Sequence, residues 1–276
     1  MENFQLRSLI KELIKESDIR ETKKWFNPND LVVTDECAAS IYEEERNVPY
    51  IYDDAKKMSG RLAKSLYGNI IDEPAIKKIL ARWPAGKIPY PVKKYSDASF
   101  PTIGVGHYIK SEEEFNKYKD YTLFNITHDE KGNKNSLFFD KEESDQFNAA
   151  NSSRTLQAYL MPADEIIALY KSDLEIHSQF KSRITQPITK EMFEALVSYA
   201  FNSGWEENRP IEKVIKLINA KKYKQAQTKI LNTPVTTGGE VSDGLISRRK
   251  RESEKFGEGG LVPPSNAEEI MKSSVN

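Results

Sequence analysis

The chain has 276 residues, of which 38% are hydrophobic and 30% charged, and its 41 basic residues nearly balance 42 acidic ones. The net charge of −1 excludes a global attraction to nucleic acid or to anionic membranes. Three Trp, 13 Tyr and 12 Phe exclude a chain that is disordered throughout, because such chains are poor in aromatic residues. A mean hydropathy of −0.65 predicts a small core wrapped by charged helices and polar insertions.

The first predicted segment, residues 1–32, is an amphipathic helix with a linker. Apolar residues recur at helical spacing from Phe4 to Ile14, and the polar stretch Asn27–Asp30 separates this helix from the next one. We predict that the helix docks either on a virion or tail protein or on the body of the chain. The start has no signal-peptide pattern, and no window of roughly 18 apolar residues occurs, so we expect neither export by a signal nor membrane insertion.

A second helix is predicted to begin at Thr34–Glu36, where acidic residues suit the positive end of the helix dipole, and to stop near Pro49. Glu45 lies in its last turn and continues the apolar stripe of Ile41 and Tyr42. In that position, desolvation and the negative helix end both favour the protonated carboxyl. A general acid needs this property. An exposed glutamate at a fraying helix end is the alternative.

Asp54 lies nine positions after Glu45. Tyr50–Tyr52 is predicted to be a short strand and Asp53–Lys56 its turn, where solvent keeps the Asp54 carboxylate ionised. One shielded and one hydrated carboxyl group is the pair used in glycoside hydrolysis. The alternative is that Asp53 and Asp54 are only turn formers.

Two insertions are predicted. The first, at about 58–94, is expected to be helical and is basic, since residues 77–94 hold six basic residues and no acidic one. The second, 111–160, is polar, with a hairpin-like turn at Lys131–Lys134. Between them, Phe100–His107 is expected to be extended, and its lone Gly-x-Gly without a phosphate-binding helix gives no support for nucleotide binding.

From about residue 162 to 256 the chain is predicted to be helical. Thr189 is a candidate N-cap, and the helix behind it is apolar nearly all round until Gly204, which predicts a buried central helix. The basic cluster Arg248–Arg251 is interpreted as a solvated face. The tail, residues 257–276, is predicted to be flexible.

These pieces together resemble the phage-type lysozymes, glycoside hydrolase family 24. The resemblance rests on Glu45 and Asp54 at their spacing, on Thr-Ile-Gly-Val-Gly-His at Thr102–His107, and on the helical stretches Thr189–Gly204 and Gly244–Glu252. It covers about 34–57, 100–110 and 162–256. It implies an α+β, mainly helical fold of two lobes, a small β-hairpin lobe and a helical lobe, within residues 33–256.

The resemblance implies a muramidase that hydrolyses the MurNAc–GlcNAc bonds of peptidoglycan without a cofactor. Glu45 would be the general acid, and Asp54 would position or deprotonate the attacking water with help from Thr102. The implied substrate-binding residues are Tyr108, Phe201 and Asn202. Such an enzyme would wait in the host cytoplasm or travel on a virion, and it would act at the bacterial cell wall.

Asp97 is a rival to Asp54. Family members place the Thr in one tight hairpin with the Asp, whereas 47 residues separate Asp54 from Thr102, and Tyr95-Ser96-Asp97 repeats the Tyr-x-Asp pattern. We favour Asp54, because only Asp54 keeps the spacing from Glu45. The basic insertion would then extend from the hairpin tip and bind the anionic peptide stems of murein.

Two other classes of function stay open. A cysteine peptidase or amidase would use Cys37 near a helix N-terminus with His107 as base, although the residues around Cys37 form a core pattern. A virion or tail component would use the fold as a wall-binding module. We predict that His107 is structural and ion-paired, and because His128 and His177 lack ligand spacing we expect no metal site.

Overall fold

The computed structural model describes residues 25–45, 47–58, 88–92, 95–96, 99–121, 127–128, 134–135, 160–234, 236–237 and 240–272. They divide into two compact units, one of residues up to Glu44 and from Lys171 onward, the other of Glu45–Tyr170. The α+β, mainly helical class is confirmed. The predicted helix from Phe4 to Ile14 lies outside the described residues, and the predicted domain boundaries stay a prediction.

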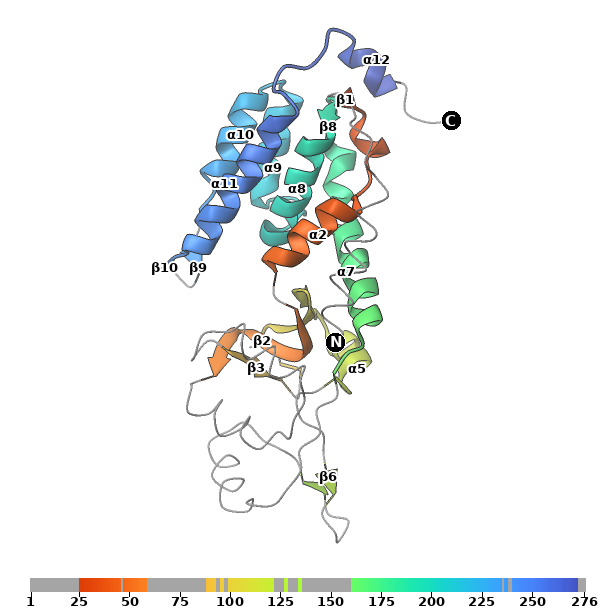
Figure 1. Ribbon diagram of the computed structural model, residues 1–276, viewed down its shortest axis with the longest axis vertical. Helices are drawn as coiled ribbons and strands as arrows, with labels where there is room; N and C mark the ends of the chain where they lie inside the picture. Colours follow the sequence, from red (N-terminus) through yellow and green to blue (C-terminus); the bar gives the residue numbers. More distant parts are fainter. Residues whose placement is uncertain are drawn as a thin grey trace. The chain divides into compact units, whose positions relative to one another are not determined.

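The first unit is a packed group of helices (Figure 1). Its helices are α2 (Asp35–Glu44), α8 (Lys190–Ser203), α9 (Pro210–Asn219), α10 (Tyr223–Leu231), α11 (Asp243–Glu258) and α12 (Ala267–Lys272), with the 3-10 helices η1 (Pro28–Asp30) and η2 (Ser178–Arg183). Its strand pairs are β1 (Trp25–Phe26) with β8 (Ile188–Thr189) and β9 (Thr236–Thr237) with β10 (Glu240–Val241). None of the helices in the described part of the chain is long and apolar enough to cross a membrane.

Helix α8 is the buried centre of this unit, as its sequence predicted. Phe193, Leu196 and Tyr199 have no exposed surface, and α11 and α2 pack against the helix (Figure 1). Thr189 is the N-cap, since its hydroxyl accepts a hydrogen bond from the Met192 amide at 3.3 Å. Gly204 ends the helix at a φ of 87°. Both predicted ends are confirmed.

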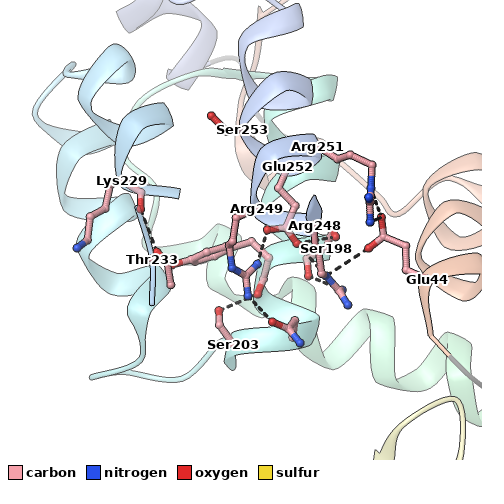
Figure 2. Close-up of polar contacts among 12 residues, drawn as sticks. Glu44, Ser198, Ser203, Lys229, Thr233, Arg248, Arg249, Arg251, Glu252 and Ser253 are labelled. Carbon is pink, nitrogen blue, oxygen red and sulfur yellow. Dashed lines mark hydrogen bonds and ion pairs between the residues drawn. The ribbon is translucent and has the colours of Figure 1, made fainter. Parts of the chain in front are cut away.

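Glu252 of α11 is a buried carboxylate in a cluster of charges. Its oxygens pair with Arg248 at 3.0 Å and with Arg249, and one of them accepts from the Ser198 hydroxyl of α8 at 2.9 Å (Figure 2). Arg248 and Arg249 are only 5% and 3% exposed. The interpretation of this cluster as a solvated face is therefore wrong for these two arginines, because a neighbouring acid and α8 allow them to be buried.

The second unit holds a four-stranded antiparallel sheet. Its strand order is β3 (Ile88–Pro91), β2 (Val48–Met58), β4 (Pro101–Gly104) and β5 (His107–Tyr108). Helix α5 (Glu112–Tyr118) follows, and a hairpin of β6 (Thr127–His128) and β7 (Lys134–Asn135) lies in the second predicted insertion. Helix α7 (Ala163–His177) has residues in both units.

Two local predictions in this sheet are wrong. Asp53–Lys56 is not a turn, because β2 continues to Met58 and pairs with β3 on one side and β4 on the other. Phe100–His107 is not one extended segment, because Gly104 and Gly106, both at positive φ, turn the chain from β4 into β5.

The two predicted insertions and the predicted tail contain regular structure. The end of the first insertion, expected to be helical, forms strand β3 and pairs with β2, whereas residues 59–87 lie outside the described part. Ser111 caps α5 by accepting from the Glu114 amide at 3.1 Å. In the tail, α12 lies beside β1, and Asn27 Nδ2 donates to the Met271 carbonyl at 3.0 Å.

Replacing Gly259 with alanine is expected to destabilise the helical unit. A Cβ atom at this position would lie 2.6 Å from the Thr189 Cβ and would overlap the hydroxyl that caps α8. Overpacking of this kind costs about 1–3 kcal/mol. The matched control is Gly244→Ala in the same helix, where a Cβ meets only the Ser242 hydroxyl at an ordinary 3.7 Å. Urea unfolding measures both variants, and equal stabilities would contradict the close contact.

Replacing Glu252 with glutamine is expected to lower the free energy of unfolding by about 3–5 kcal/mol, because the change removes the charge that pairs with buried Arg249 and one of the two charges that pair with buried Arg248. The control is Glu254→Gln, two residues further along α11, where the carboxylate is 61% exposed and lies 3.9 Å from Lys250. We expect that control within about 0.5 kcal/mol of the parent. A similar loss in both variants would show that burial of the charge is not the cause.

Candidate active site

Glu45 directly follows the last residue of α2 and is half-buried. The end of α2 is held by Glu44, whose carboxylate pairs with Arg251 at 2.7 Å and with Arg248 at 3.3 Å, both from α11 (Figure 2). The last residue of α2 is therefore held by α11, and Glu45 is the next residue of the chain. No local sequence pattern indicates these partners, because they lie more than 200 residues further along the chain.

Asp54 is exposed on β2, and Tyr52 lies two residues before it on the same face of the strand. The Tyr52 side chain is 5% exposed. Burial raises the pKa of its phenol, and the nearby charges of Asp54 and Glu45 raise the pKa further. Asp54 and Glu45 are thus both close enough to Tyr52 to act on its phenol electrostatically.

Thr102 lies opposite Tyr52 in the pairing of β2 with β4. Its hydroxyl donates to the Phe100 carbonyl at 3.0 Å, and the Asp54 amide donates to the same carbonyl at 3.0 Å. One backbone oxygen therefore joins the two predicted residues, although 47 residues separate them in the chain. The rival Asp97 lies outside the described residues, so the choice between the two aspartates stays a prediction.

Tyr108 lies opposite Thr102 on β5 and is 42% exposed. Its ring centroid is 6.2 Å from that of Phe100, which is 53% exposed. Two neighbouring aromatic rings in solvent are unusual, because such side chains normally lie in the core, and they mark a candidate binding surface. The sequence prediction missed Phe100, because an isolated Phe in a polar stretch gives no signal of exposure.

Phe201 and Asn202 belong to the first unit, whereas Asp54, Thr102 and Tyr108 belong to the second. The half-buried Phe201 ring lies 5.0 Å from the ring of His177. Asn202 is exposed, and its side-chain oxygen accepts from Arg249. Arg249 in turn lies 4.6 Å from the centre of the Tyr199 ring. Asn202 is thus held from α11 at the exposed end of α8.

Cys37 is not arranged as a nucleophile. It is 3% exposed, and its thiol donates to the Glu194 carbonyl at 3.8 Å. Burial, with a further contribution from the Glu194 charge, raises the pKa of the thiol to about 12, so the reactive thiolate is scarce at neutral pH. The predicted core position of Cys37 is confirmed.

The His107 Nε2 atom lies 3.2 Å from a Glu114 oxygen, a contact that agrees with the structural role predicted for this histidine. The other Glu114 oxygen accepts from the Lys110 amide at 2.7 Å, so the histidine ties β5 to the start of α5. Among the residues that the structure describes, no group of three or more His, Cys, Asp or Glu side chains is placed to hold a metal ion.

Three solved structures are similar to this chain. An endolysin from the Escherichia coli O157:H7 phage FAHEc1 has a TM-score of 0.42 and 16% identity, with 85% of this chain and 98% of that chain covered. The muramidase domain of SpmX from Asticaccaulis excentricus has a TM-score of 0.42 and 16% identity, covering 82% and 97%. A P22 lysozyme mutant has a TM-score of 0.34 and 20% identity, covering 68% and 97%. No curated protein sequence matches the chain.

The sequence profile of the phage lysozyme family matches residues 90–252, which is more than half of the chain. The matched range includes Thr102, Tyr108, Phe201 and Asn202, and it begins after Glu45 and Asp54. A lysozyme-type hydrolase of the bacterial cell wall is the functional class that this match supports. The chain therefore belongs to the phage lysozyme family.

Proposed function

We propose that the chain is a muramidase that hydrolyses the MurNAc–GlcNAc bonds of peptidoglycan. The observation that carries this proposal is that the Phe100 carbonyl accepts hydrogen bonds from both the Asp54 amide and the Thr102 hydroxyl. Tyr52 lies opposite Thr102, and the charges of Asp54 and Glu45 both raise the pKa of its phenol. Membership of the phage lysozyme family supports the substrate class.

Glu45 is the proposed general acid, which protonates the glycosidic oxygen as the bond to the leaving sugar breaks. It directly follows α2 and is half-buried, so part of the carboxyl group remains accessible to a bound glycan strand. The carboxylate of Glu44, one residue earlier, is already paired with two arginines of α11.

Asp54 is the proposed residue that positions or deprotonates the attacking water. Its exposure lets a water molecule reach the carboxylate. The hydroxyl hydrogen of Thr102 is already donated to the Phe100 carbonyl, so the lone pairs of its oxygen are left to accept a hydrogen from that water. A water held between Asp54 and Thr102 would be oriented before the sugar binds.

Tyr108 and its neighbour Phe100 form the proposed contact with the glycan strand in the second unit. The apolar C–H face of a pyranose ring suits an exposed aromatic ring, and the sugar hydroxyls remain free for hydrogen bonds. Phe201 and Asn202 are the proposed contacts from the first unit. We also propose that the basic insertion binds the peptide stems of murein. Most of that insertion, residues 59–87, lies outside the described part of the chain.

Storage in the host cytoplasm and delivery on a virion are both compatible with this activity, and docking of the N-terminal segment on a virion or tail protein stays a prediction. A wall-binding module without activity is the alternative. It predicts binding to purified peptidoglycan and no new reducing ends, whereas a muramidase releases ends at muramic acid.

The Glu45→Gln and Asp54→Asn variants are each expected to lose at least about 100-fold in the release of reducing ends, because each change removes a carboxyl group that the reaction needs. Purified peptidoglycan is the substrate, and both variants should keep the parent melting temperature. Cys37→Ser, a near-isosteric change away from these residues, is the control and should retain activity.

Asp97→Asn decides between the two aspartates in the same assay. We expect it to keep most of the activity. A full loss in Asp97→Asn together with an active Asp54→Asn would transfer the role to Asp97. A loss confined to Cys37→Ser, with the appearance of free amino groups, would overturn the muramidase in favour of a peptidase or amidase.

Replacing Phe100 or Tyr108 with alanine is expected to raise KM about 10-fold with little change in kcat, because each ring contributes binding energy equally before and during the reaction. Both side chains are exposed, so the melting temperature should stay near that of the parent. The matched control is Val262→Ala, an apolar side chain that is 83% exposed in the other unit. An unchanged KM in both ring variants would remove this surface from the site.

A further inference from the structure

Asp53 is a buried acid beside an exposed one. Its side chain is on the opposite face of β2 from Asp54, and only 1% of the residue is exposed. A buried carboxylate is costly unless it is hydrogen-bonded. One of its partners is the Phe100 amide, which donates to Asp53 Oδ1 at 3.4 Å. The neighbour of Asp53 across the ladder is Pro101, which has no amide hydrogen to donate to β2.

Phe100 is therefore held by both of its backbone polar groups. Its amide donates to Asp53, and its carbonyl accepts from the Asp54 amide and from the Thr102 hydroxyl. The two residues proposed to hold the attacking water thus share a partner whose other end is fixed by Asp53. A shift of the Phe100 backbone would move both contacts together.

The regular pairing of β2 with β4 at the site is short, with Tyr52 opposite Thr102 and Asp53 opposite Pro101. The β2–β4 ladder is irregular between Val48 and Tyr52, and the β2–β3 ladder is irregular between Asp53 and Lys57. A tight hairpin fixes the register of its strands by its turn, but 47 residues lie between Asp54 and Thr102. Contacts between the strands themselves must replace the turn, and Asp53 to Phe100 is such a contact at the site.

We propose that Asp53 is a positioning residue that holds the Phe100 backbone and through it the geometry of Asp54 and Thr102. This inference rests on the proposed hydrolase function for its catalytic consequence. In a simple hairpin a short turn fixes the strand register, and here the Asp53 carboxylate helps to fix the register of β2 against Phe100. It does not touch the substrate, because only 1% of the residue is exposed.

Kinetics of Asp53→Ala and Asp53→Asn test the catalytic consequence. The alanine variant is expected to lose about 10–100-fold in kcat with KM nearly unchanged, because a small displacement of reacting groups is enough for such a loss. The asparagine variant keeps an oxygen that can accept from Phe100 and should recover kcat to within a few-fold of the parent. Equal kcat in both variants and the parent overturns the proposal, as does an equal loss in both.

Amide hydrogen exchange in the full chain tests the contact without reference to activity. Asp53→Ala should raise exchange at Phe100 and Asp54 at least 10-fold while Leu196 in α8 stays protected, and Asp53→Asn should restore the protection. Unchanged exchange at Phe100 in the alanine variant overturns the proposal. If the parent releases no reducing ends but exchange responds as expected, the muramidase assignment fails and the positioning contact stands. If Leu196 also loses protection in Asp53→Ala, the alanine variant has opened beyond the site. Exchange at Phe100 and Asp54 in Asp53→Asn then tests the contact: protection at the parent level supports it, and lost protection overturns it.

Discussion

The buried carboxylate of Glu252 constrains how the helices of the first unit pack. Its partners on α11 and α8 are Arg248, Arg249 and Ser198. A charge in this position is tolerated only when each oxygen has a partner, so α8 and α11 are restricted to the arrangement that supplies the partners. Arg248 also reaches Glu44, which brings the end of α2 under the same restriction. Glu45, the proposed general acid, is the residue after Glu44. The charge cluster thus holds the residue that directly precedes the proposed acid.

In the sheet unit, hydrogen bonds to the Phe100 backbone, and not ion pairs, position the proposed residues. The three hydrogen bonds at the Phe100 backbone use neutral peptide groups, one hydroxyl and one buried carboxylate, and they connect residues from two strands. Asp53 and Asp54 show how adjacent acids take separate roles in a strand. Because successive side chains point to opposite faces, one carboxylate is buried and binds a backbone amide, while the next is exposed and open to water.

The sequence predicted those parts of the fold whose causes are local. Thr189, the apolar helix behind it and Gly204 all act within one helix, and each was found where the pattern placed it. The Asp53–Asp54 pair was assigned to a turn because both residues favour turns in isolation, but the strands that pair with them come from residues 88–104. Arg248 and Arg249 were assigned to solvent because their burial depends on α8. Glu45 and Asp54 were singled out by local patterns, and the family resemblance then supplied the roles predicted for them and for Thr102.

The long connection between Asp54 and Thr102 is less costly than its length suggests. Loop-closure entropy grows only with the logarithm of length, so lengthening a tight turn to about 40 residues costs roughly 2 kcal/mol. Each hydrogen bond at Phe100 contributes about 1 kcal/mol, and three of them balance that cost. Loop-closure entropy therefore does not prevent an insertion between Asp54 and Thr102. The insertion would, however, disturb the relative positions of the two residues unless the strands are held together at the site. The contacts of Phe100 with Asp53, Asp54 and Thr102 meet that condition whatever the inserted residues do.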